Sequence, residues 1–321
     1  MSGTSVDAID SALVSFTGDG LELLHTHEHP IERQLRADIA DISRPGESEI
    51  ERLGRLDREL GALFAAATNT LLAEAGVGAD RVTAIGSHGQ TVRHLPPPAG
   101  SNGFTLQIGD PNTIAELTGI TTVADFRRRD MACGGQGAPL APAFHAAVFA
   151  ATGIDRAIVN IGGIANATVL HGEQLIGGFD TGPGNTLLDL WHARHRGANF
   201  DRNGRWAAGG QMSRPLLEDL LSDPYFDLQG PRSTGKEHFN LPWLEPHLAR
   251  HPGLDAADIQ ATLAQLTAQS IANALATSRL QVKEVYVCGG GAHNAHLLEC
   301  LDTALAGART GTTAALGLDP D

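Results

Sequence analysis

Apolar residues recur at intervals of three and four throughout residues 51–76, which predicts a long amphipathic helix there. The apolar positions on its predicted buried face are Leu53, Leu56, Leu60, Leu63, Phe64 and Ala67. Similar patterns predict further helices at 111–119, opened by Pro111, at 186–196, at 256–280 and from Asn294 onward.

Short apolar runs bounded by turn residues predict strands. These runs are 10–16, 82–86, 104–109, 120–126 and 284–291. Residues 157–172 form two strand-like runs around a Gly-Gly pair, which is typical of a hairpin. The polar stretch "SHGQTVRH" (87–94) is expected to be a loop. Because strand-like and helix-like segments alternate, the predicted fold class is α/β with antiparallel hairpins mixed in.

The length of 321 residues is enough for two domains, each with its own core. The segment 127–142 contains several glycines and prolines and is the best candidate for the boundary. We therefore expect an N-terminal domain at 1–129 and a C-terminal domain at 130–321.

The formal net charge of −14 argues against nucleic acid as the main partner, since phosphate backbones require Lys and Arg. Apolar runs stay well below the roughly 18 residues of a membrane span, and the chain does not open like a signal peptide. Cys133, Cys288 and Cys300 are an odd number and lack CxxC spacing, so neither a metal cluster nor a disulfide framework is expected. This cysteine usage favours the reducing cytoplasm.

Four turns rich in glycine or small residues open the chain or follow strand-like segments. They are "MSGTSVDAID" (1–10), "NIGGIAN" (160–166), "FDTGPGN" (179–185) and "CGGGAHN" (288–294). Backbone N–H groups in such turns attract anions, and phosphate is the natural guest. Ser2, Thr4 and Ser5 add hydroxyl donors, and Asp7 and Asp10 add the hard oxygens that Mg²⁺ prefers.

Asp180 is predicted to lie in one of these turns, where it is either a turn-former or a catalyst. Asp189, in the following helix, is expected to be structural. The stretch "GPRSTGKE" (230–237) nearly matches a phosphate-binding P-loop, but Glu237 replaces the required hydroxyl and no strand is predicted before it. We therefore reject the P-loop interpretation and retain only Arg232 or Lys236 as a phosphate contact.

The sequence resembles the anhydro-N-acetylmuramic acid kinase family of the sugar kinase and actin superfamily. The resemblance rests on the four turns above and on "GSHGQTVRH", "LQIGDP", "AELTGITTVADFRRRDMACGGQGAPL" and "GPRSTGKEHFNLPWL", all in the family's order. It implies a two-domain actin-like (ribonuclease H-like) fold with a nucleotide cleft between the domains. It also implies ATP-dependent opening of 1,6-anhydro-N-acetylmuramic acid by water, with phosphorylation of O6, in cell-wall recycling.

The resemblance also implies roles for single residues. Asp180 would be the general base, and Asp7 would hold Mg²⁺, directly or through water. The expected ATP and phosphate contacts are Gly3, Thr4, Ser5, Asp7, Asp10, Gly162, Gly163, Gly289, Gly290 and Gly291. The expected sugar contacts are His88, Gln90, Arg127 and Arg129, with strand alternation turning Arg128 to the opposite side.

This sequence departs from the family pattern at three places. Ala8 replaces a usual glycine, and the apolar residues before "MSGTS" and the helix after the "GGG" segment are absent. We therefore expect the 2–5 loop to be held less firmly than in relatives. A kinase for another sugar and a nucleotide-binding regulator without catalysis remain alternatives, and a homodimer is left open. No membrane partner is expected.

Overall fold

The computed structural model describes residues 1–3, 6–17, 20–95, 103–228, 232–278 and 280–320. The chain divides into two compact units, Met1–Ala138 (unit 1) and Pro139–Asp321 (unit 2). We propose that these units are the two expected domains, with their boundary in the loop that follows Ala132.

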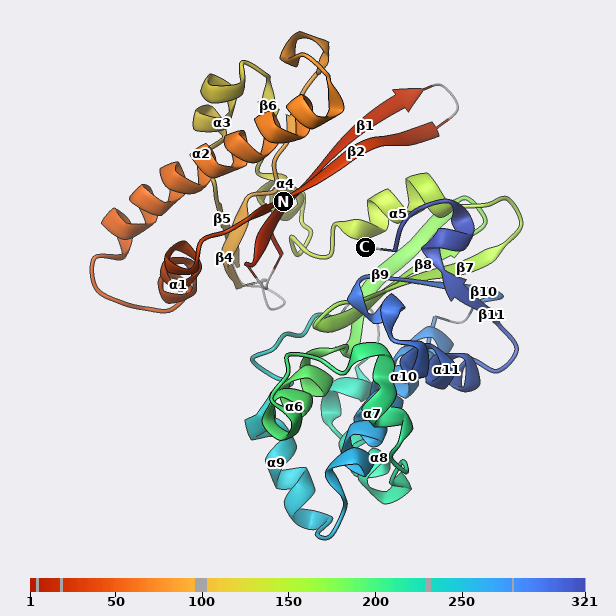
Figure 1. Cartoon of the computed structure of the whole chain (residues 1–321). Coiled ribbons are helices and arrows are strands. Elements are labelled where there is room, and N and C mark those ends of the chain that lie inside the picture. The colour runs from red at the N-terminus through yellow and green to blue at the C-terminus, as the bar shows by residue number, and fades with distance from the viewer. Residues whose placement is uncertain (4–5, 18–19, 96–102, 229–231, 279, 321) are drawn as a thin grey trace. The chain divides into compact units, whose positions relative to one another are not determined.

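The described part of unit 1 contains both strands and helices, coloured red to yellow in Figure 1. Its described strands are β1 (Ala8–Thr17), β2 (Gly20–Pro30), β3 (Ile85–Gly86), β4 (Gln90–Leu95), β5 (Phe104–Ile108) and β6 (Thr122–Val123). Its described helices are α1 (Arg33–Ile42), α2 (Glu49–Ala75), α3 (Pro111–Thr118) and α4 (Phe126–Ala132). The strands pair as β1–β2 and β4–β5, both antiparallel, and as β3–β6, parallel. Within the described residues, the strands of unit 1 therefore form three separate pairs.

Helix α2 is the predicted amphipathic helix, and its apolar stripe supplies much of the core of unit 1. Leu56, Leu60 and Phe64 are buried in one cluster with residues of β1 and β5. The helix packs against β1 and β2 and ends at Gly76, whose φ of 65° is the left-handed cap that glycine favours. Helix α3 starts where Pro111 predicts, because the Asp110 carboxylate caps its first N–H groups.

Unit 2 is built on one mixed sheet of five strands. Its strands are β7 (Asp155–Ile161), β8 (Ile164–His171), β9 (Gln174–Pro183), β10 (Glu284–Cys288) and β11 (Arg309–Thr312). Its described helices are α5 (Ala141–Phe149), α6 (Thr186–Arg196), α7 (Arg205–Ala208), α8 (Arg214–Leu221), α9 (Leu241–Arg250), α10 (Ala256–Ala276) and α11 (Ala295–Ala304). The order is β11-β10-β7-β8-β9, with β7, β8 and β9 as an antiparallel meander and β10 parallel to both of its neighbours. The predicted α/β class is confirmed.

Both faces of this sheet are covered. Val159 and Ile161 of β7 belong to a large core with residues of α10, whereas Ile158 points to the opposite face and packs with Phe149 of α5. Helix α5 also packs against β8 and β9. A strand buried on both sides needs apolar residues at successive positions, which explains the unbroken run before Asn160.

Several predicted segments differ in the structure. The expected loop 87–94 contains β4, in which Val92 is buried and Thr91 accepts a hydrogen bond at 3.1 Å from Gln107 of the paired strand. Polar side chains of β4 and β5 form hydrogen bonds with each other across the strand pair, so the polarity of this stretch did not indicate a loop. The predicted strands 82–86 and 120–126 shrink to the two-residue pair β3–β6.

Candidate active site

Two glycine-bearing turns of unit 2 are joined by backbone hydrogen bonds. The β7–β8 turn contains Gly162 and Gly163, and α6 begins at Thr186. The carbonyl of Gly162 accepts from the N–H of Asn185 at 2.8 Å, and that of Gly163 accepts from Gly184 and Thr186 at 2.9 and 3.1 Å. The N–H groups of Asn185 and Thr186, at the start of α6, are thereby used within the protein. A phosphate at this turn would have to be met by other donors.

The third turn follows β10 and packs against the end of β7. Gly289 has a φ of +76°, and a Cβ there would collide with the Asn160 side chain and lie 3.2 Å from the Ile161 carbonyl. A Cβ on the next residue, Gly290, would be 3.8 Å from the Asn185 amide nitrogen. The three glycine motifs of unit 2, far apart in sequence, therefore converge at one end of the sheet.

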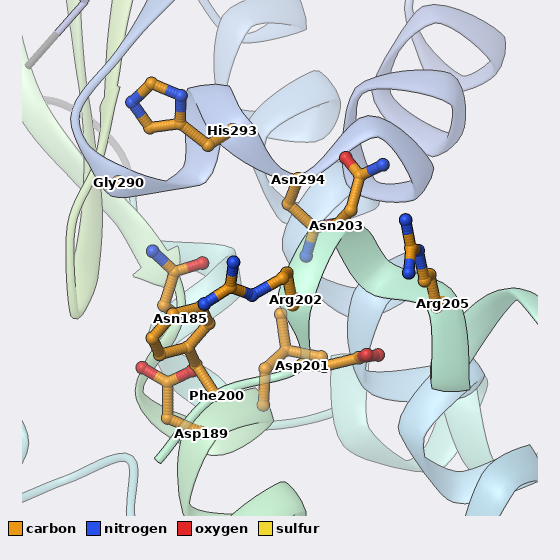
Figure 2. Close-up of a pocket in the computed structure, with 11 residues that line it drawn as sticks. Asn185, Asp189, Phe200, Asp201, Arg202, Asn203, Arg205, Gly290, His293 and Asn294 are labelled. Carbon is orange, nitrogen blue, oxygen red and sulfur yellow. The ribbon is translucent and has the colours of Figure 1, made fainter. Parts of the chain in front are cut away.

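A cavity of about 710 Å³ opens beside these turns, within the usual range for small-molecule sites. Figure 2 shows that residues of α6, of the segment after it and of the turn before α11 all contribute to its wall. Its lining residues are Asn185, Leu188, Asp189, Phe200, Asp201, Arg202, Asn203, Arg205, Gly290, His293 and Asn294. Of the residues expected from sequence to contact ATP, Gly290 is in this wall.

Asp189 was expected to be structural, but it lines this cavity. Burial raises the pKa of its carboxyl to about 6, opposed by the positive charges of Lys236 and His192. A carboxylate that lines a cavity and has its pKa raised by burial is typical of a binding site. Asp189 follows Thr186 by three residues, and this spacing places the two side chains on the same face of α6. That spacing is the sequence signal that could have identified Asp189 as a site residue.

Asp180 lies in strand β9, paired with Asn166 of β8, and not in a glycine-rich turn. The flanking glycines misled the prediction. Position 178, within the strand, requires a glycine because Pro142 of α5 occupies the place where a Cβ would be. The carboxylate is therefore carried by a rigid element and not by a loop.

The Asp180 side chain is half-buried and held by the segment that follows residue 231. Its Oδ2 accepts the backbone N–H of Thr234 at 2.9 Å and the hydroxyl of Ser233 at 3.2 Å. Burial raises the pKa of the Asp180 carboxyl above its ordinary value, although these hydrogen bonds and the charge of Arg232 act to lower it.

Arg232 and Tyr225 hold the backbone of this strand. The Asp180 carbonyl accepts from the Tyr225 hydroxyl at 2.8 Å and from Nε of Arg232 at 3.0 Å. The Arg232 guanidinium is buried and also donates to the carbonyl of Leu228 at 2.9 Å. Arg232 thus serves as an internal brace. Of the two cations retained from the P-loop-like stretch, only Lys236 is exposed.

In unit 1, the structure brings two of the expected sugar contacts together. Nε of Arg127 donates to Nε2 of His88 at 2.7 Å, and Nη1 of Arg127 donates to the Gly137 carbonyl at 2.7 Å. Burial lowers the pKa of His88, and Nδ1 faces the Gly89 carbonyl at 2.8 Å. The ring is therefore neutral, with its proton on Nδ1.

The strand alternation expected for the arginine run was wrong. Arg127, Arg128 and Arg129 lie on helix α4, where successive residues are about 100° apart, and only Arg127 is half-buried. Arg129 is exposed on another side of the helix and does not join Arg127. Gln90 is buried and accepts a hydrogen bond from the Ser2 hydroxyl, so it braces the N-terminal segment.

The first motif is only partly described, since Thr4 and Ser5 lie outside the described residues. The expectation of a loosely held loop also falls on these positions. Gly3 accepts a backbone hydrogen bond from Val6 at 3.2 Å. Asp10 and Met1 exchange two backbone hydrogen bonds, at 2.8 and 2.7 Å. The Asp7 side chain accepts from the N–H of Ala8 at 3.1 Å.

The described part of the chain lacks two kinds of feature. It contains no group of three or more His, Cys, Asp or Glu side chains arranged to hold a metal ion. Among the same residues, none of the helices is both long and apolar enough to cross a membrane.

The whole sequence, residues 1–321, matches the family model described as Anhydro-N-acetylmuramic acid kinase. The chain belongs to this family. It is 53% identical over 322 residues to the anhydro-N-acetylmuramic acid kinase of Shewanella oneidensis, covering 100% of this chain and 86% of that protein. It is also 53% identical to the anhydro-N-acetylmuramic acid kinase of Shewanella halifaxensis over 321 residues, with the same coverage.

Similarity to solved structures is much weaker. Component A of the (R)-2-hydroxyglutaryl-CoA dehydratase of Acidaminococcus fermentans aligns with 95% of this chain and 91% of its own, at 12% identity and a TM-score of 0.44. This structural similarity is too weak to indicate a family, so family membership rests on the sequence comparisons.

Proposed function

We propose that this protein is an ATP-dependent kinase that opens 1,6-anhydro-N-acetylmuramic acid with water and phosphorylates O6. The products are N-acetylmuramic acid 6-phosphate and ADP, and the reaction serves the recycling of cell-wall peptidoglycan. The observation that carries the proposal is the match to the anhydro-N-acetylmuramic acid kinase family along the entire chain.

We assign Asp180 as the general base. Water attacks C1 and its proton passes to the carboxylate, while the bond between C1 and the bridging O6 breaks. O6 then bonds to the γ-phosphorus and the bond from that phosphorus to the ADP oxygen breaks. Within the described residues, both hydrogen bonds to the carboxylate end on Oδ2, which leaves Oδ1 for the water. A raised pKa makes Asp180 a stronger base than an exposed aspartate.

We assign the cavity beside α6 to the nucleoside of ATP. Its volume of about 710 Å³ suits a ligand of this size. Asp189 supplies a carboxylate acceptor for hydroxyl or amino groups of the nucleoside. Gly162, Gly163 and Gly290 would lie along the phosphates, where the absence of side chains allows close approach.

We propose that Mg²⁺ binds together with ATP, through the phosphates. Such an ion is held by one or two carboxylates together with phosphate oxygens and waters, so a cage of three protein ligands is not required. Asp7, with an exposed carboxylate, fits this requirement alone or through water. The ion would neutralise charge on the transferred phosphoryl group.

We assign Arg127 to the lactyl carboxylate of the sugar. Two of its nitrogens are used by His88 and Gly137, and these bonds fix the direction of the remaining one, Nη2. A guanidinium held in this way suits a carboxylate partner. We propose the cytoplasm as the location, no nucleic-acid or membrane partner, and leave a homodimer open.

The experiment is an assay with γ-labelled ATP and 1,6-anhydro-N-acetylmuramic acid, with N-acetylmuramic acid and N-acetylglucosamine as parallel acceptors. The proposal predicts a labelled sugar 6-phosphate from the anhydro sugar. Faster labelling of another acceptor would favour a kinase for that sugar. ATP binding without any labelled sugar would favour a regulator.

A further inference from the structure

The segment 232–240 is fixed at both ends, although its middle is exposed. The buried guanidinium of Arg232 anchors the start, and the fully buried Phe239 anchors the end. Between them, the amide of Asn240 donates to the carbonyls of Lys236 at 3.1 Å and Glu237 at 2.8 Å. The backbone at Lys236 is therefore held in place, and its side chain starts from a defined position.

The side chain of Lys236 lies over the β7–β8 turn. A Cβ on Gly163 would be 2.8 Å from Cε of Lys236 and 3.6 Å from its Nζ. The same Cβ would lie 2.8 Å from the Thr186 hydroxyl, a buried oxygen that has no hydrogen-bond partner within the described structure. An ammonium group and an unpartnered hydroxyl thus flank the glycine turn.

The charge of Lys236 is not consumed by an ion pair. None of the ion pairs formed by the described residues includes it, although it is close enough to Asp189 to act on that carboxyl. A cation left without a paired anion, above a glycine turn, is available to an anionic ligand. The N–H groups of Asn185 and Thr186 cannot serve that ligand, because they already donate to the carbonyls of Gly162 and Gly163.

We propose that Lys236 binds the transferred phosphoryl group of ATP at the Gly163 turn, together with the Thr186 hydroxyl. This inference rests on the proposed kinase function and adds a phosphate-binding residue to it. Phosphoryl transfer depends on positioning and on the stabilisation of negative charge. The ammonium group of Lys236 would stabilise the charge that develops as the bond to ADP breaks.

The position of Lys236 has a further consequence. The same short loop donates the Thr234 N–H to Asp180 at 2.9 Å and carries Lys236 to Gly163. One loop therefore orients the base that activates water and the cation that receives the phosphoryl charge. A shift of this loop would disturb both steps together.

The test compares Lys236→Met with Lys283→Met, which removes the other lysine of the chain at an exposed position. Binding of a β,γ-imido ATP analogue and of AMP is measured by calorimetry, and kcat is measured with the anhydro sugar. Loss of a charged contact should weaken the analogue roughly 10- to 100-fold and leave AMP unchanged. The kcat should fall about 100-fold or more, and Lys236→Arg should recover part of it. Lys283→Met should match the wild type.

Equal weakening of the analogue and AMP would overturn the proposal, because it would mean a structural role. A kcat within about tenfold of the wild type would also overturn it, since the loss expected is larger. If the wild type binds the analogue but phosphorylates none of the sugars, the proposed function fails, and the comparison of analogue with AMP still decides the role of Lys236. Failure of the wild type to bind the analogue would overturn both.

Discussion

The two units hold their expected site residues by different means. In unit 2, Asp180 lies on β9, an edge strand of the five-stranded sheet, and the three glycine turns meet around the end of β7. In unit 1, the expected sugar contact Arg127 lies on a short helix and is held by two hydrogen bonds, one to a histidine and one to a loop carbonyl. The contrast indicates that sheet pairing fixes the backbone that carries Asp180, whereas side-chain hydrogen bonds fix Arg127.

The largest effect is expected in unit 2. Asp180→Asn keeps the shape of the side chain but cannot take a proton from water, so kcat should fall by roughly 10²- to 10⁴-fold. Binding of the imido ATP analogue should be unchanged, which serves as the folding control. Retention of more than about a tenth of the wild-type kcat would show that Asp180 is not the base.

A smaller effect is expected in unit 1, where neighbouring arginines provide a matched pair. Arg127→Met removes a charge-assisted contact to the sugar, and kcat/KM for the sugar should fall roughly 10- to 100-fold. Arg129→Met, on the exposed side of α4, should leave it near the wild-type value. Equal losses in both variants would remove the basis for choosing Arg127.

The smallest effect concerns stability. The pKa of Asp189 is raised to about 6, so between the ordinary aspartate pKa and 6 the unfolded chain ionises first. This group therefore destabilises the fold as pH rises through that window. Asp189→Asn should raise Tm by a few degrees, on the order of 2–4 °C, at about pH 7.5. The gain should shrink toward about pH 4.5, as differential scanning fluorimetry can show. A gain that is independent of pH would contradict the assignment.

The sequence was informative wherever a local pattern had one physical meaning. The stripe of α2 and the Pro111 start of α3 were predicted correctly because helical spacing and capping are local. The polar strand β4 and the strand around Asp180 were not, because hydrogen bonds to β5 and the close approach of Pro142 to Gly178 come from residues distant in sequence.

The candidate site was predictable in composition but not in arrangement. Glycine pairs marked the turns, since close backbone approach leaves few other choices. The position of Asp189 depends on which face of α6 meets a cavity, and that of Lys236 on a loop anchored by Arg232. The rejected P-loop pattern shows the same limit. Its lysine lies over a glycine turn after all, but the turn belongs to the β7–β8 hairpin.

The most direct test of the central claim is to run the reaction in ¹⁸O-labelled water and locate the label by mass spectrometry and ³¹P NMR. Opening of the bridge by water, followed by transfer to O6, predicts one labelled oxygen at C1 of the sugar 6-phosphate and none in its phosphate group. Unlabelled product incubated in the same water corrects for exchange at C1. Label in free phosphate, with no label in the sugar above that control, would mean that the enzyme hydrolyses ATP, and would contradict the account.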